Sequence, residues 1–345
     1  MRAVLYDAFA AEPTVIEVSD PTPRPDGVVL QVEATGLCRS DWHAWQGHDP
    51  DIVLPHVPGH ELAGRIAAVG AEVRGWRVGD PVAVPFICAC GRCSQCRTGQ
   101  QQVCLEQQQP GFNYWGSFAE YVSIPFAEVN LIALPEQVGF DTAAALGCRF
   151  ATSYRAVTAV GQVRPAEWVV VFGCGGVGLS AVMIAAAAGA RVIAVDTEPA
   201  ALALAAEHGA SHTLLTGAGP VDAQLRELTG GGADVTIDAI GAAAVVQSAL
   251  SSLRPRGRHV QIGLLPEPIT VDLSFLAFRE LAWLGSHGMA AHAFGPLLDL
   301  VGAGALRPDQ LITRTIALDA APDALVSMGR GGSAGVTIIH PQQSG

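Results

Sequence analysis

Residues Trp168 to Gly178 read WVVVFGCGGVG, an apolar and mostly β-branched run that ends in a glycine-rich turn. The turn fits the pattern G-x-G-x-x-G, which has meaning only between a strand and a helix. An alanine-rich segment follows from Gly178 to Ala188, so the sequence predicts a strand, a tight turn and a helix. Unpaired N–H groups at the start of such a helix face an anion, and we therefore expect the turn to bind the pyrophosphate of a dinucleotide.

An acidic residue extends this prediction to the ribose. Asp196 ends the next predicted strand, at the distance where a carboxylate meets the ribose 2′-hydroxyl. It would repel a 2′-phosphate, and no Arg follows nearby, so the sequence favours NAD over NADP. An alternative is a glycine-rich turn without a ligand. The residues expected to contact the cofactor here are Gly173, Gly175, Gly176, Val177, Gly178 and Asp196.

From about residue 151, apolar strands alternate with alanine-rich helical segments. A parallel connection needs a crossover long enough for a helix, so this rhythm predicts an α/β fold with a doubly wound parallel sheet. The predicted strands are Val169 to Phe172, Arg191 to Val195, Thr213 to Leu215, Asp234 to Asp238, His259 to Ile262 and Ala282 to Gly285. The predicted helices are Gly178 to Ala188, Pro199 to His208, Val221 to Leu228 and Ala242 to Leu253.

The first 150 residues have a different pattern, with short strands and frequent turn signals. The strands expected here are Ala3 to Tyr6, Val28 to Ala34, Leu62 to Val69, Pro81 to Phe86, Phe118 to Ile124 and Leu131 to Leu134. After residue 288 the pattern is mixed, with a helix expected at Phe294 to Val301 and a strand at Val336 to Ile339. Periodicity does not assign this last segment to a domain.

Composition limits the possible functions. The chain has 345 residues, and its 20 basic and 32 acidic residues give a formal charge of 20 − 32 = −12. All basic residues are Arg, which excludes Schiff-base chemistry and a P-loop because both need Lys. An acidic chain without a basic cluster is poorly suited to phosphate backbones, so we expect no nucleic-acid partner.

One uncharged stretch, Trp168 to Ala190, is long enough to span a bilayer, but its glycines divide it into a strand, a turn and a helix. We therefore expect no membrane partner. The amino terminus, MRAVLYDAF, lacks the apolar core and cleavage site of a signal peptide, and we expect a cytoplasmic protein.

Four of the eight cysteines lie in one fifteen-residue window with the spacing C-x2-C-x2-C-x7-C: Cys90, Cys93, Cys96 and Cys104. Four thiolates in so short a segment can close a tetrahedron around Zn²⁺, which leaves no place for substrate and indicates a structural site. An iron–sulfur cluster and a nucleic-acid-binding zinc ribbon are the alternatives. Cys88 lies close enough to leave the ligand register open.

Several further candidates are scattered: Cys38 in GLCRSDWH, His60 in PGHE and Cys148 in LGCRF. No spacing rule joins them, and from composition alone a buried thiol and a polar core histidine are the simpler readings.

The segments GLCRSDWHAWQG, PGHELAG, CGRCSQCRTGQQQVC, LGCRF and GCGGVG resemble, in order and spacing, those of zinc-dependent alcohol dehydrogenases of the medium-chain dehydrogenase/reductase family. The resemblance spans nearly the whole chain. It implies a β-rich GroES-like catalytic domain formed by residues 1–150 and 288–345, an inserted Rossmann domain at residues 151–287, and an active site between them. It also implies two zinc ions per chain, a catalytic one held by Cys38, His60 and Cys148 and a structural one held by the four-cysteine loop.

The same resemblance suggests roles for residues near these motifs. Ser40 and His43 match a proton relay, and Asp41 matches the carboxylate that orients the ligand histidine. Glu61 matches a carboxylate behind the catalytic zinc, and Phe86 matches a wall of the substrate pocket. Ser40 could instead be a turn residue, His43 a surface residue and Glu61 a solvated charge. Phe86 and the neighbouring aromatic residues Trp42, Trp45 and Trp115 could equally be core residues.

Cofactor contacts are implied as well. Arg39 matches a pyrophosphate contact, and Thr152 matches a contact to the nicotinamide ring. Some family members clamp the pyrophosphate with a late Arg, where this chain has Gly335 in GRGGSAGVTII, with Arg330 five positions earlier. Cofactor affinity is therefore expected to depend more on Arg39.

The sequence thus predicts an NAD-dependent zinc alcohol dehydrogenase that acts on a small-molecule alcohol or carbonyl compound, as a homo-oligomer, either a tetramer or a dimer. A polyol or formaldehyde-processing dehydrogenase of the same family is an alternative, although polyol relatives usually carry Glu in place of Cys148. A quinone reductase would lack both zinc sets. A catalytically silent NAD-binding zinc protein is the alternative from another class.

Overall fold

A computed structural model describes residues 1–216, 221–330 and 334–343. The chain divides into two compact units. The first contains Met1–Ala151 and Gly288–Gly345, and the second contains Thr152–His287.

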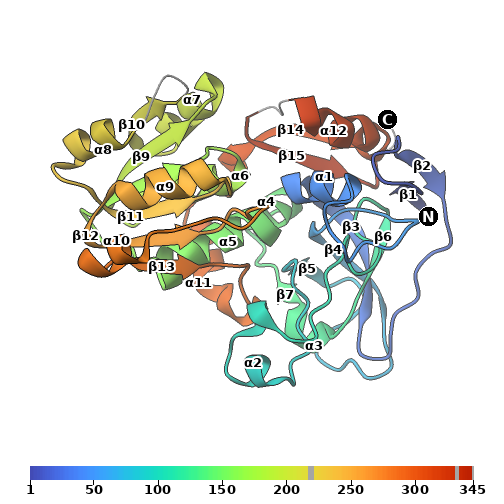
Figure 1. Cartoon of the computed structure of the whole chain (residues 1–345). Helices are drawn as coiled ribbons and strands as arrows, with labels where there is room; N and C mark the ends of the chain where they lie inside the picture. The colour runs from blue at the N-terminus through green and yellow to red at the C-terminus, as the bar shows by residue number, and fades with distance from the viewer. Residues whose placement is uncertain (217–220, 331–333, 344–345) are drawn as a thin grey trace. The chain divides into compact units, whose positions relative to one another are not determined.

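The second unit is built on a six-stranded parallel sheet with the order β10-β9-β8-β11-β12-β13 (Figure 1). Its strands are β8 (Trp168–Phe172), β9 (Arg191–Asp196), β10 (Ala210–Leu215), β11 (Ala233–Asp238), β12 (Leu253–Gln261) and β13 (Ala282–Gly285). The strand order reverses at β8, and ligands of such sheets bind at the carboxyl ends of the strands at this point. The predicted doubly wound parallel sheet is confirmed.

Helices connect these strands: α6 (Gly176–Ala187), α7 (Pro199–Glu207), α8 (Asp222–Thr229), α9 (Ala243–Ser251) and α10 (Leu273–Phe278). In α6 every residue from Gly178 to Ala185 is buried, because the helix is covered on all sides. β12 begins at Leu253, six residues before the predicted start, and α10 was not predicted. Arg254 to Arg256 are exposed and carry no apolar pattern, and the pairing with β11 shifts register between Leu253 and Arg258.

The first unit contains a seven-stranded sheet and a separate hairpin. The sheet has the order β14-β15-β3-β4-β5-β7, with β6 paired to β3, and β1 pairs with β2. The strands are β1 (Arg2–Leu5), β2 (Thr14–Glu17), β3 (Val28–Leu37), β4 (Glu61–Val69), β5 (Pro81–Val84), β6 (Tyr121–Ile124), β7 (Ile132–Ala133), β14 (Ile312–Ala317) and β15 (Val336–His340). β15 pairs antiparallel with β3, so the end of the chain completes a sheet begun near its start (Figure 1).

Short helices complete this unit: α1 (Arg39–Trp45), α2 (Ser94–Arg97), α3 (Ala127–Asn130), α4 (Phe140–Ala145), α11 (Gly295–Gly302) and α12 (Ala321–Ser327). A π-helical turn, Leu146–Phe150, follows α4 and leads into α5 (Ala151–Arg155), where the two units join. No helix in the described parts of the chain has the length and apolar character needed to cross a membrane.

Candidate metal and cofactor sites

Asp41 organises the segment around Cys38. α1 begins directly after Cys38, and Asp41 Oδ2 accepts a hydrogen bond of 2.9 Å from the Cys38 backbone N–H. Asp41 Oδ1 accepts from the Gly59 N–H at 3.1 Å and from His60 Nδ1 at 2.8 Å. Asp41 and His60 are both fully buried. One carboxylate therefore fixes a helix start and the orientation of a histidine nineteen residues away.

The structure brings the three scattered candidates together. Cys38, His60 and Cys148, with Glu61, offer ligand atoms that all lie within 4.8 Å of one another. They come from the start of α1, the start of β4 and the π-helical turn.

His60 provides the test of whether this set fits a metal. Its Nδ1 donates to Asp41, while its buried Nε2 has no hydrogen-bond partner among the described residues. An orphaned imidazole nitrogen costs free energy unless a ligand uses it. Two sulfurs and one imidazole nitrogen are the ligands that Zn²⁺ accepts at an open tetrahedral site. The hydrogen bond from Cys148 lowers the pKa of the Cys38 thiol well below its usual range, which favours the thiolate that a metal needs. The residues fit zinc.

Arg149 forms a buried ion pair that the sequence analysis missed. Its backbone N–H and Nε each donate to Glu61 Oε1 at 2.9 Å, and its Nη2 donates to Oε2. The Glu61 side chain is fully buried and that of Arg149 is 7% exposed. Burial raises the pKa of Glu61, and the guanidinium opposes this. No local sequence pattern predicts this ion pair, because its two residues are 88 positions apart in the chain.

The proposed relay residues follow Cys38 on α1. Ser40 Oγ lies 3.8 Å from Cys38 Sγ. His43 is exposed, and its Nδ1 lies 2.9 Å from Nδ1 of His48, a partner that the sequence analysis did not identify. Desolvation, followed by the charges of Arg39 and His48, lowers the pKa of His43. Neutral imidazole, the form that accepts a proton, is therefore favoured.

Arg39 contacts other parts of the first unit. Its guanidinium lies 4.2 Å from the centre of the Trp42 ring, and Nη1 donates to the Met328 carbonyl. Trp42 is partly buried against the same core that contains Trp45. The remaining donors of Arg39 lie on an exposed side chain, where an anion can reach them.

The four cysteines of the loop form a compact cluster, with all four sulfurs within 4.8 Å of one another. Cys93 Sγ lies 3.5 Å from Cys96 Sγ and 3.8 Å from Cys104 Sγ, and Cys90 Sγ lies 4.0 Å from Cys96 Sγ. Sulfurs at the corners of a zinc tetrahedron are about 3.8 Å apart. Backbone N–H groups lower the pKa of Cys93 to about 6. The set fits a closed zinc site.

Cys88 lies outside both clusters found among the described residues. Its sulfur is buried near the Tyr114 hydroxyl, 3.9 Å away, and burial raises its pKa to about 12. All eight cysteines are free thiols.

The glycine-rich turn has the shape that the fingerprint requires. Gly173 has φ +89°, and a Cβ there would overlap Ile240. A Cβ at Gly178 would overlap the Gly173 carbonyl, so this glycine allows α6 to pack against the turn. No atom lies within 4 Å of a Cβ built on Gly175, which leaves its backbone open to a ligand.

Asp196 lies beside this turn at the end of β9. Its Oδ2 accepts from the Cys174 N–H at 2.5 Å, and its Oδ1 accepts from the Glu198 N–H at 2.9 Å. The carboxylate is only partly buried and keeps free lone pairs for ribose hydroxyls. Gly176 and Val177 are the first two residues of α6, where N–H groups are unpaired.

Thr152 and Phe86 are both buried. Thr152 lies on α5 in the second unit, next to Ser153, whose hydroxyl donates to the Val177 carbonyl at 2.8 Å. The Phe86 ring centre lies 6.1 Å from that of His60. Phe86 thus borders the cluster that contains His60, and Thr152 is connected to the glycine-rich turn through the hydrogen bond of its neighbour Ser153.

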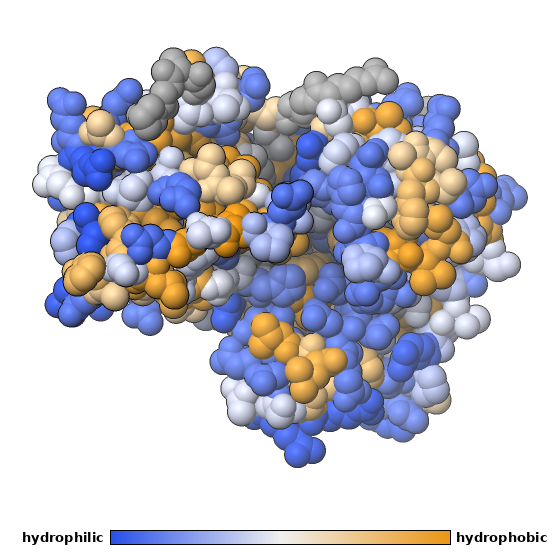
Figure 2. Space-filling model, viewed as in Figure 1, coloured by the Kyte–Doolittle hydropathy of each residue, from blue (hydrophilic) through white to orange (hydrophobic). Residues whose placement is uncertain are grey.

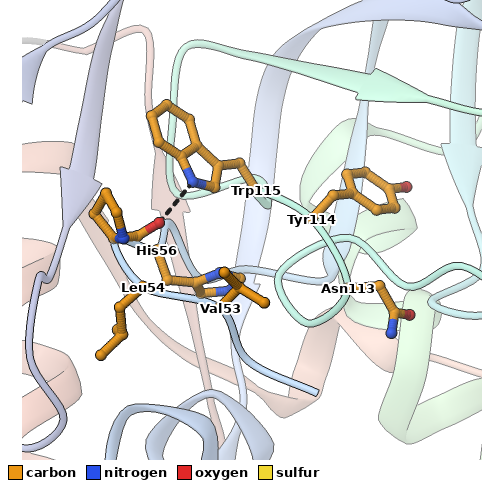
Figure 3. Close-up of a pocket in the computed structure, with 7 residues that line it drawn as sticks. Val53, Leu54, His56, Asn113, Tyr114 and Trp115 are labelled. Atoms are coloured by element: carbon orange, nitrogen blue, oxygen red, sulfur yellow. Dashed lines mark hydrogen bonds between the residues drawn. The ribbon is translucent and has the colours of Figure 1, made fainter.

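Trp115 borders a different pocket of the first unit, with a volume of about 480 Å³ (Figure 3). Its Nε1 donates to the Pro55 carbonyl at 3.0 Å, and the ring lies opposite Leu54 and Val53 in the close-up. The loop that carries Trp115 also carries Phe112, whose ring centre is 5.1 Å from that of His60.

Gly335 has φ +94°, and a Cβ at this position would overlap the Thr313 side chain. An Arg at this position would be strained, because this backbone conformation favours glycine. The preceding residues 331–333 of the GRGGSAGVTII segment lie outside the described residues, and the side chain of Arg330 does too.

Comparisons with known proteins agree with these sites. A family model described as zinc-binding dehydrogenase matches residues 176–303, and one described as alcohol dehydrogenase GroES-like domain matches residues 24–136. An alcohol dehydrogenase of Rhizobium meliloti is 35% identical over 307 residues, covering 88% of this chain and 89% of that protein. An NAD-dependent alcohol dehydrogenase of Sulfurisphaera tokodaii is 32% identical over 334 residues, covering 93% and 95%. The solved structure of alcohol dehydrogenase TADH from Thermus sp. ATN1 matches with a TM-score of 0.91 at 32% identity over 99% of both chains.

The fold and the two cysteine-containing clusters define a zinc-binding dehydrogenase with a GroES-like part. The chain belongs to the zinc-dependent alcohol dehydrogenases of the medium-chain dehydrogenase/reductase family. The resemblance inferred from the sequence motifs is confirmed.

Proposed function

We propose that this chain interconverts an alcohol and the corresponding aldehyde or ketone, with zinc and NAD as cofactors. The observation that carries the proposal is the close set of Cys38, His60 and Cys148, in which the buried His60 Nε2 has no hydrogen-bond partner within the described part of the chain. When bound, Zn²⁺ acts as a Lewis acid that makes the alcohol hydroxyl more acidic, and NAD accepts the hydride.

The ligand residues each have a defined part. Cys38 and Cys148 supply two negative charges that balance the metal, and His60 supplies the neutral third ligand. Asp41 accepts the Nδ1 proton of His60, which selects the tautomer with a free Nε2. Three protein ligands would leave a fourth position on the metal open to the alcohol oxygen.

Ser40 and His43 form the proton path in this proposal. The Ser40 hydroxyl accepts the alcohol proton while its own proton moves on towards His43. The exposed His43 ring releases the proton to water. The lowered pKa of His43 supports this role, since the ring is neutral and ready to accept a proton near pH 7.

The second unit binds NAD in this proposal. Gly175, Gly176 and Val177 present their N–H groups to the pyrophosphate, and Asp196 accepts hydrogen bonds from the ribose hydroxyls. Arg39 contributes a positive charge to the pyrophosphate, and Thr152 contacts the nicotinamide. The carboxylate of Asp196 disfavours the extra phosphate of NADP.

The remaining assignments follow the same logic. The four-cysteine cluster holds a structural zinc that stabilises the loop from Cys90 to Cys104. The first unit acts as the catalytic domain, with Phe86 at the wall of the substrate pocket. Free thiols are typical of reducing compartments, which supports a cytoplasmic location.

We also propose that the protein forms a homo-oligomer, a tetramer or a dimer. β13 is an edge strand of the parallel sheet, and edge strands promote association. α10, which precedes β13 in the chain, carries Phe278 and Leu273, whose exposed fractions are 90% and 73%. Figure 2 shows apolar side chains gathered over α10 and β13. Analytical ultracentrifugation of the wild type and Phe278→Glu tests this, and a wild-type monomer at micromolar concentration contradicts it.

The function is tested with a panel of primary, secondary, aromatic and polyhydroxy alcohols. Purified zinc-loaded protein is expected to reduce NAD in the presence of at least one of these classes, with NADP a poorer acceptor. Absence of NADH formation with every class, in protein that holds two zinc ions, contradicts the proposal.

A further inference from the structure

Two of the proposed zinc ligands are each followed in the sequence by one member of a buried ion pair. Glu61 follows His60, and Arg149 follows Cys148. Three hydrogen bonds join Glu61 and Arg149, and they engage both carboxylate oxygens. The pair therefore connects the start of β4 to the π-helical turn, the two segments that carry these ligands.

Glu61 can also compete for the metal. One of its carboxylate oxygens lies within 4.8 Å of the ligand atoms of Cys38, His60 and Cys148. Carboxylate oxygens bind Zn²⁺ at about 2.0–2.2 Å, so a small movement of this side chain would fill the fourth position. A site filled in this way would be closed to an alcohol.

Two glycines give the ion pair its space. A Cβ on Gly36 would overlap Glu61 Oε2 and lie 2.9 Å from Arg149 Nη2. A Cβ on Gly147 would lie 3.1 Å from the Glu61 Cα. Two glycines thus provide the space in which the carboxylate and the guanidinium meet.

The charges indicate why Arg149 is needed. Two thiolates balance Zn²⁺, so the Glu61 carboxylate adds one uncompensated negative charge. Arg149 neutralises that charge. Without it, a buried carboxylate would lie beside a divalent cation, and coordination would be its most favourable way to recover the lost pairing.

We propose that Arg149 is a positioning residue that holds Glu61 off the metal and so keeps the fourth coordination position open. The inference rests on the proposed zinc function of the cluster. In this proposal Arg149 is not itself a metal ligand. Its pairing with Glu61 determines whether the fourth coordination position is open or closed.

The test uses Arg149→Met, Glu61→Gln and the double variant, each with Co²⁺ in the catalytic site. The visible absorption of Co²⁺ reports its ligands, and imidazole serves as a probe that binds only to an open fourth position. Wild type and the double variant are expected to bind imidazole with a spectral change. Arg149→Met is expected to bind it about 10- to 100-fold more weakly and to lose turnover by a similar factor, with the KM for NAD unchanged.

A matched control is Arg258→Met in the second unit, which breaks the 2.6 Å ion pair with Glu167. This control variant is expected to leave imidazole binding unchanged. That result would show that loss of an ion pair by itself does not weaken imidazole binding. Unaltered imidazole affinity in Arg149→Met overturns the proposal. A double variant that binds imidazole as weakly as Arg149→Met overturns it as well.

If Arg149→Met does not fold or does not hold metal, the imidazole titration is carried out on Arg149→Lys. One ammonium engages the two carboxylate oxygens less well than a guanidinium, so imidazole affinity is expected to fall between wild type and a closed site. A Lys variant that binds imidazole more weakly than wild type while its Co²⁺ spectrum shows no added carboxylate ligand would show a purely structural role and overturn the inference. The imidazole titration needs no alcohol turnover, so it remains decisive even if the proposed function fails.

Discussion

Replacing Asp41 by Asn is expected to weaken catalytic zinc binding and turnover without emptying the four-cysteine site. The buried carboxylate accepts three hydrogen bonds, from His60 Nδ1 and the backbone N–H groups of Gly59 and Cys38. An amide keeps the size of the side chain but accepts on one oxygen only. If that oxygen retains His60 and Gly59, the NH₂ group faces the Cys38 N–H, and two donors oppose each other in a buried place.

The cost follows from these contacts. One hydrogen bond to a charged group is lost, worth about 1.5–3 kcal/mol, and this converts to about 10- to 150-fold in zinc affinity or kcat/KM. Competition with a chromophoric chelator measures the affinity, and NADH formation measures the rate. Asp141→Asn is the control, because Asp141 also pairs with a histidine, His340 at 2.7 Å, but on a partly exposed side chain. An Asp41→Asn protein with unchanged affinity and rate would refute the orienting role.

Three further predictions address the other sites. Cys93→Ala is expected to release the structural zinc and lower the melting temperature while the remaining folded protein keeps its kcat; a stable variant with two zinc ions would contradict this. Asp196→Gly is expected to narrow the preference for NAD over NADP, measured as the ratio of kcat/KM values, and an unchanged ratio would count against ribose binding. Desolvation, Arg39 and His48 together keep the pKa of His43 low, so His48→Gln, which removes one of these contributions, is expected to raise it. Since alcohol oxidation needs neutral His43, the acidic limb of the pH–rate profile should move to higher pH, and an unmoved limb would exclude coupling between the two rings.

Local patterns in the sequence were sufficient to predict the glycine-rich turn, the four-cysteine cluster and the parallel strands. The glycine-rich turn was predictable because Gly173 and Gly178 are required by backbone geometry within one short segment. The four-cysteine cluster was predictable for the same reason, since its ligands lie within fifteen residues. The six parallel strands followed from their apolar runs, although the start of β12 did not, because its exposed residues 254–256 carry no apolar pattern.

Features that depend on distant contacts were not accessible in this way. Periodicity left the segment after residue 288 unassigned, because β15 is defined by pairing with β3, some 300 residues earlier in the chain. Arg149 was missed because its partner Glu61 is 88 residues away. The gathering of Cys38, His60 and Cys148 was suggested by family resemblance, and only the three-dimensional arrangement supplies a physical reason for it.

Zinc content measured together with turnover in Cys148→Ala tests the central claim most directly. The account predicts two zinc ions per chain in the wild type, one in the variant, and no detectable alcohol oxidation by the variant. A variant that retains both zinc ions and oxidises alcohol at the wild-type rate would show that Cys148 does not hold the catalytic metal.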